Sequence, residues 1–144
     1  NEARTVAGTL KRSISGMALV DQAPEVQFIL DHCGTPDIKG GALEPWRTHM
    51  KEISQRPNVA AKISGVVAYA DAERWTLETL KPWVEHTVEC FGWDRLVWGS
   101  DWPVCTLGGG LSTWVAATHA LFSGTSEEER AKLFSGNAKR LWKL

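Results

Sequence analysis

Short apolar stretches alternate along the chain with longer segments of helical periodicity. Three stretches are mostly apolar and bounded by turn residues: 26–31 (VQFILD), 59–64 (VAAKIS) and 95–99 (RLVWG). Strands that are covered on both faces have this composition. Helical patterns lie between these stretches and after the last one. Repeated strand–helix units predict an α/β fold with a parallel sheet and right-handed crossovers.

The helical segments are marked by apolar stripes at three- and four-residue steps. One stripe predicts a helix over 43–53, which Pro57 ends. A second stripe, over 80–91, places Pro82 in the first turn of its helix, where a missing N–H costs little. Further helical patterns cover 112–122, 126–134, which begins with a capping box from Ser126 to Glu129, and 138–144.

The first residues fit this pattern poorly. Residues 13–24 (SISGMALVDQAP) are compatible with a helix before the first strand, whereas residues 1–12 have no clean period. We therefore divide the chain into an atypical N-terminal segment, 1–16, and one strand–helix domain, 17–144.

Composition excludes several classes of function. With 144 residues and a net charge of −1, the chain is one domain without the basic surface of a nucleic-acid or anionic-membrane binder. There is no apolar run of about 18 residues that would predict a membrane span, and we find no signal-peptide pattern. Three cysteines without CxxC spacing favour a reducing compartment, so we expect a cytoplasmic protein.

Polar, reactive side chains follow each predicted strand. The first strand runs into His32, the second carries Lys62 and Ser64 near its end, and the third is followed by Asp101. In an α/β barrel the active site is built at this end of the strands. Taken singly, such a histidine is more often a structural hydrogen-bonding residue and such an aspartate a turn former. Three neighbouring strands that deliver His, Lys and Asp to one rim favour a catalytic site instead.

Side-chain alternation predicts which face each residue occupies. If Phe28 and Leu30 face the barrel interior, His32 does so too, and Asp31 points toward the helices.

The same counting groups Lys62 with Ser64, and Asp101 with Gly99, which would leave space beneath the aspartate. Lysine is almost never buried without a partner, and Asp101 on the next strand is the partner we expect for Lys62.

The stretches FILDHCGTPDI, PNVAAKISG and DRLVWGSDWPV, with the closing FSGNAKRLW, resemble the C-terminal part of the amidohydrolase superfamily. The resemblance is nearest to its sugar-lactone lactonases, such as those acting on fuconolactone and rhamnonolactone, and to pyrone dicarboxylate lactonases. It implies a partial (β/α)8 barrel, or TIM barrel, in which about three parallel strands are the sixth to eighth.

The resemblance also implies roles for individual residues. Asp101 would be the general base, and His32 and Lys62 would polarise the carbonyl or protonate the leaving alkoxide. Trp102 and Ser64 would contact a small-molecule lactone or carboxylic acid. If the full-length family member binds zinc or another divalent metal, Asp101 and His32 would be ligands.

The departures from the family are large. No H-x-H pair of the kind that begins such enzymes is present, and a complete barrel needs about 200 residues or more. We therefore expect a truncated barrel that is inactive alone and forms a homo-oligomer, because Phe28, Leu30, Ala60 and Val97 would be exposed unless a second copy covers them. The alternative cover is the atypical N-terminal segment, folded back over the same surface. A related decarboxylase is the alternative enzyme class.

Overall fold

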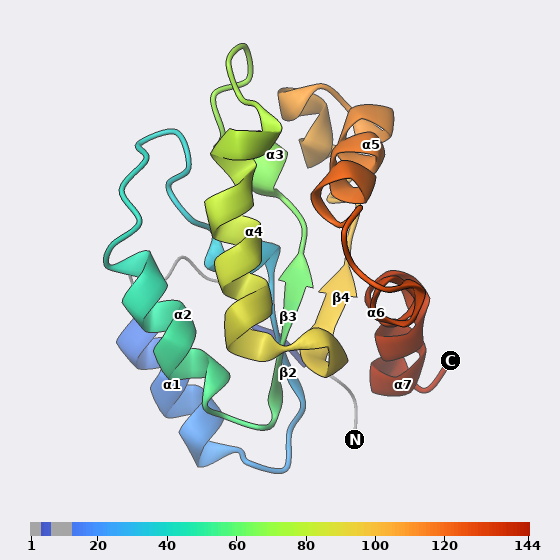
Figure 1. The fold of residues 1–144 in the computed structure, drawn as a ribbon. Helices are drawn as coiled ribbons and strands as arrows, with labels where there is room; N and C mark the ends of the chain where they lie inside the picture. Colours follow the sequence, from blue (N-terminus) through green and yellow to red (C-terminus); the bar gives the residue numbers. More distant parts are fainter. Residues whose placement is uncertain (1–3, 7–12) are drawn as a thin grey trace.

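Four parallel strands form the sheet of the computed structural model, which describes residues 4–6 and 13–144 (Figure 1). In sheet order they are β1 (Arg4–Val6), β2 (Phe28–Leu30), β3 (Val59–Ile63) and β4 (Leu96–Trp98). The predicted parallel sheet is confirmed. The sequence did not predict β1, because it lies in a stretch, residues 1–12, that has no clean apolar period. The rest of the atypical segment lies largely outside the described residues.

Helices α1 (Ser13–Gln22) to α4 (Leu77–Phe91) connect these strands, and the remaining helices follow β4. Helix α2 (Trp46–Ser54) and α4 lie side by side over one face of the sheet (Figure 1). Helix α1 confirms the helix expected before the first predicted strand. The α-helices are α1 (Ser13–Gln22), α2 (Trp46–Ser54), α3 (Val66–Tyr69), α4 (Leu77–Phe91), α5 (Leu111–Leu121), α6 (Glu127–Ala131) and α7 (Asn137–Trp142).

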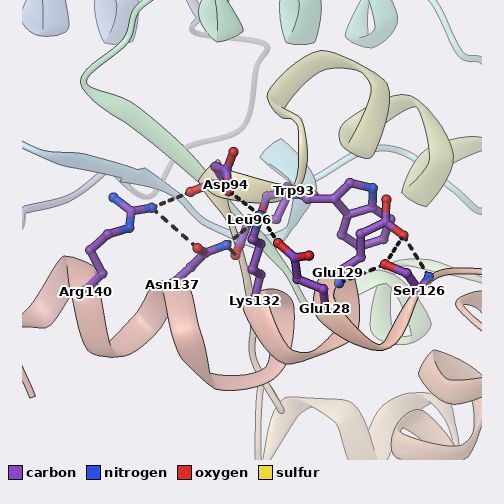
Figure 2. Close-up of polar contacts among 9 residues, drawn as sticks. All are labelled: Trp93, Asp94, Leu96, Ser126, Glu128, Glu129, Lys132, Asn137 and Arg140. Atoms are coloured by element: carbon purple, nitrogen blue, oxygen red, sulfur yellow. Dashed lines mark hydrogen bonds and ion pairs between the residues drawn. The ribbon is translucent and has the colours of Figure 1, made fainter.

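The start of α4 differs from the prediction. Thr76 caps the helix and forms a capping box with Thr79, so the helix begins at Leu77. Pro82 therefore lies in the second turn rather than the first. The predicted capping box of Ser126 and Glu129 at α6 is confirmed (Figure 2).

The C-terminal helices bind the start of β4 through hydrogen bonds and an ion pair (Figure 2). The Asn137 amide, in a side chain that is almost fully buried, donates to the carbonyl oxygens of Trp93 (2.6 Å) and Leu96 (2.8 Å). Lys132 pairs with Asp94 at 3.0 Å. The two hydrogen bonds from Asn137 satisfy backbone carbonyls where the strand begins, and the ion pair joins the same two segments. The closing FSGNAKRLW stretch therefore supports the sheet at the end opposite the predicted site.

The two faces of the sheet bury different residues, and this corrects the expected alternation in β2. Phe28 and Leu30 belong to the large core beneath the helices. Ile29 instead pairs in register with Ala60 and clusters with it and Val97 on the other face, where Ala138 and Leu141 of α7 pack. The prediction that Phe28 and Leu30 face inward is wrong because FIL is apolar throughout and has no alternation to reveal its orientation.

The sequence predicts self-association because four apolar side chains of an open barrel fragment would be exposed to water. These side chains are at most 3% exposed in the structure: Phe28, Leu30, Ala60 and Val97. That argument is therefore wrong for these residues, and the oligomeric state stays a prediction. Within the part of the chain that the structure describes, no helix has both the length and the apolar character needed to cross a bilayer.

Candidate active site

His32 reaches the rim through a turn that follows β2. Residues His32–Gly34 form a single 3-10 turn, with φ values of 54° at His32 and 50° at Cys33. The imidazole Nδ1 lies 2.8 Å from the Ser64 hydroxyl oxygen and 3.7 Å from Asp101 Oδ1. Because the backbone leaves the extended conformation at His32, strand alternation does not govern its side chain. His32 and Asp101 nevertheless converge, as the sequence predicted.

Asp101 holds a buried oxygen without a hydrogen-bond partner among the described residues. Its side chain is 11% exposed, and Oδ2 is the unpaired atom. The residue follows β4 in a left-handed conformation with φ of 54°. An unsatisfied buried carboxylate oxygen and a strained backbone each cost free energy, and both occur preferentially at functional sites.

Gly65 is the point around which the site is assembled. It connects β3 to α3 with φ of 73°. A Cβ built there would lie 2.9 Å from His32 Cβ, 3.0 Å from Tyr69 Cε2 and 3.1 Å from Asp101 Oδ2. Both the backbone conformation and the available space therefore require glycine.

Lys62 pairs with Asp31, which corrects the expected pairing with Asp101. Asp31 lies two residues after Ile29 and therefore on the same face of the sheet as Ile29, Ala60 and Val97, which is the inner face. The prediction that Asp31 points toward the helices is also wrong. The lysine stem crosses Gly99, whose added Cβ would lie 3.0 Å from Lys62 Cδ. Gly99 thus makes room for Lys62. The same built Cβ would lie 3.3 Å from Ser64 Cβ, so the ion pair borders the His32 cluster.

The Ser64–His32–Asp101 group is not arranged as a nucleophilic triad. Both the Ser64 hydroxyl and the Asp101 carboxylate face the same imidazole nitrogen, Nδ1. A triad requires them on opposite nitrogens. Ser64 is fully buried, so its contact orients His32. Trp102 is 68% exposed beside Asp101, and its contact with substrate stays a prediction.

Sequence reasoning missed Tyr69, the last residue of α3. Its ring packs edge-on against His32, with centroids 6.4 Å apart. Burial raises the pKa of the Tyr69 hydroxyl, and the negative charges of Asp101 and Asp31 raise it further. Tyr69 lies four residues after Gly65, in the segment that follows β3. Its closeness in sequence to the end of β3 was the one signal that could have indicated a place at the site.

The described residues do not by themselves form a metal centre. Within residues 4–6 and 13–144, no three His, Cys, Asp or Glu side chains are grouped so that they could hold an ion. His32 and Asp101 are two suitable ligand types, and the unpaired Asp101 Oδ2 would accept one contact. Two ligands are fewer than a bound zinc requires.

A parallel sheet joined by helices, with polar side chains gathered after the carboxyl ends of the strands, has the arrangement of a segment of an α/β barrel. The family described as Amidohydrolase matches residues 13–144. The chain belongs to this family.

Individual relatives agree with this assignment. The chain is 32% identical over 134 residues to L-fucono-1,5-lactonase of Burkholderia ambifaria, covering 89% of this chain and 45% of that protein. A zinc-bound amidohydrolase of Burkholderia multivorans superposes with a TM-score of 0.90 at 28% identity, over 97% of this chain and 52% of its own.

A putative 2-pyrone-4,6-dicarboxylic acid hydrolase of Pseudomonas putida shares the fold, with a TM-score of 0.77 at 24% identity, over 98% of this chain and 51% of its own. The chain thus spans about half the length of these relatives. The sheet is accordingly part of a (β/α)8 barrel.

Proposed function

We propose that this chain supplies one half of the active site of a hydrolase that opens the lactone ring of a sugar acid. The observation that carries the proposal is the unpaired, buried Oδ2 of Asp101 beside His32 at the carboxyl end of the sheet. Similarity to an L-fucono-1,5-lactonase supports the substrate class. The reaction type follows from what these side chains can do.

Lactone hydrolysis requires a base for water and a proton for the leaving oxygen. Asp101 Oδ2 accepts a proton from water as the water oxygen attacks the carbonyl carbon. The ring carbon–oxygen bond then breaks, and the departing alkoxide takes a proton. His32 is the proposed proton donor or carbonyl-polarising group, because Ser64 engages Nδ1 and no described residue hydrogen-bonds to Nε2.

Lys62 contributes charge rather than a bond to Asp101. Its ammonium is paired with Asp31, and its side chain is 24% exposed. The Lys62 side chain and Ser64 Cβ both lie against Gly99, so the pair adjoins the residue that orients His32. We assign Lys62 to stabilising the negative charge that develops on the substrate.

The only indication of zinc comes from a related structure. The Burkholderia multivorans amidohydrolase contains a zinc ion. The described residues of this chain offer at most His32 and Asp101 as ligands. We therefore derive no step of the reaction through a metal.

The test restores a barrel of full size. Residues 13–144 are joined to the N-terminal half of the Burkholderia ambifaria lactonase, and both this fusion and the chain alone receive fuconolactone, rhamnonolactone, pyrone dicarboxylate and hydroxybenzoates. We expect lactone hydrolysis by the fusion and none by the chain alone, because several members of a catalytic group are missing from it.

Other outcomes would favour the alternatives. Release of carbon dioxide from the aromatic acids would favour a decarboxylase. A fusion that folds but turns over no substrate, together with a 144-residue chain that sediments as a dimer, would favour an inactive fragment that self-associates.

A further inference from the structure

Tyr69 lies on the same rim as His32 and Asp101, but the proposed reaction gives it no role. Its ring meets the His32 ring edge-on, at an interplanar angle of 61°. The position of a Cβ on Gly65 lies about equally close to Tyr69 Cε2 (3.0 Å) and to Asp101 Oδ2 (3.1 Å). The phenol, the imidazole and the carboxylate therefore surround one backbone position.

The Tyr69 hydroxyl is protonated at neutral pH, because a phenol ordinarily loses its proton only at about pH 10. It is therefore available as a neutral hydrogen-bond donor. No residue in the described part of the chain hydrogen-bonds to this hydroxyl in the structure.

The proposed reaction needs a donor of this kind. Attack on a lactone carbonyl places negative charge on its oxygen, and donors held near that oxygen stabilise it. The ion pair with Asp31 partly offsets the positive charge of Lys62, and His32 has its Nδ1 engaged by Ser64. A neutral donor at Tyr69 would add to the stabilisation that these two groups provide.

We propose that Tyr69 is a substrate-contacting residue whose hydroxyl donates a hydrogen bond to the carbonyl oxygen of the bound lactone. This inference rests on the proposed function. It involves no transfer of a proton from Tyr69, only a hydrogen bond that strengthens as charge develops on the oxygen.

The test exploits the fact that Tyr69 is the only tyrosine in the chain. Tyrosine labelled with carbon-13 at Cζ gives a single signal, which is followed while fuconolactone is added to the 144-residue chain. We expect a saturable shift of this signal. The Tyr69→Phe variant keeps the ring that packs against His32, and we expect it to bind the lactone about 5–10-fold more weakly, the loss typical of one hydrogen bond.

Each outcome decides a different point. Equal affinity of wild type and Tyr69→Phe would overturn the role of Tyr69 and leave the proposed function standing. Absence of lactone binding by the wild-type chain would overturn the role of Tyr69, whereas lactone hydrolysis by the fused enzyme decides the proposed function separately. A displaced His32 ring signal in the unliganded Tyr69→Phe variant would show that the hydroxyl acts on the fold, and would also overturn the proposal.

Discussion

Replacing Gly65 by alanine tests whether the site is packed as the structure shows. Gly65 and Gly41 have nearly the same φ, 73° and 72°, but an added Cβ meets three side chains at Gly65 and nothing within 4 Å at Gly41. Gly41→Ala therefore carries conformational strain alone, about 1–2 kcal/mol. Gly65→Ala adds overpacking, about 1–3 kcal/mol more.

The two variants are compared by urea unfolding, followed by the fluorescence of the eight tryptophans. We expect Gly65→Ala to lower the free energy of unfolding by about 2–5 kcal/mol in total and to shift the His32 ring signals. Gly41→Ala should leave those signals unchanged. Equal destabilisation by the two substitutions, with His32 undisturbed in both, would refute the crowded arrangement around Gly65.

Three further predictions follow from other contacts. Asn137→Ala should lower the free energy of unfolding by about 1–3 kcal/mol, because two backbone carbonyls lose their donor, and should leave lactone binding unchanged; weakened binding would contradict its placement away from the site. Cys90 should react with a thiol reagent before Cys33, since burial raises the pKa of the fully buried Cys33 to about 11; rapid modification of native Cys33 would oppose this. The contribution of the Cys33 thiol to the free energy of unfolding should be complete below about pH 9 and fall as the pH rises toward 11. Asp31→Asn should cost about 1–3 kcal/mol by leaving the Lys62 charge unpaired, and adding Lys62→Met should recover part of that loss; a purely additive double variant would argue against the ion pair.

The order of strands and helices could be predicted from the sequence because the apolar stripes and turn residues report it directly. Orientation within β2 could not, since Phe28, Ile29 and Leu30 are all apolar and either face can be buried. The pairing of Lys62 with Asp31 was missed for the same reason, because the side of the sheet on which Asp31 lies depends on that orientation.

His32 and Asp101 were placed together correctly, although strand alternation does not explain how His32 arrives there. The turn at His32 has a positive φ that nothing in the local sequence specifies, apart from the glycine that follows at position 34. Tyr69 was missed because it lies beyond the strand, on a helix of only four residues. Such short-range features depend on packing against the rest of the sheet and have no periodic signal.

The most direct test of the proposed site is the effect of Asp101→Asn on kcat/KM for L-fucono-1,5-lactone in the fused enzyme. Asparagine keeps the shape of the side chain but cannot accept a proton at Oδ2. We expect a fall on the order of 100- to 10,000-fold, the usual contribution of a general base. Asp94→Asn, which changes an 80%-exposed carboxylate at the opposite end of the sheet, is the unaffected control. An Asp101→Asn enzyme within threefold of the parent would contradict the assignment of Asp101 as the base.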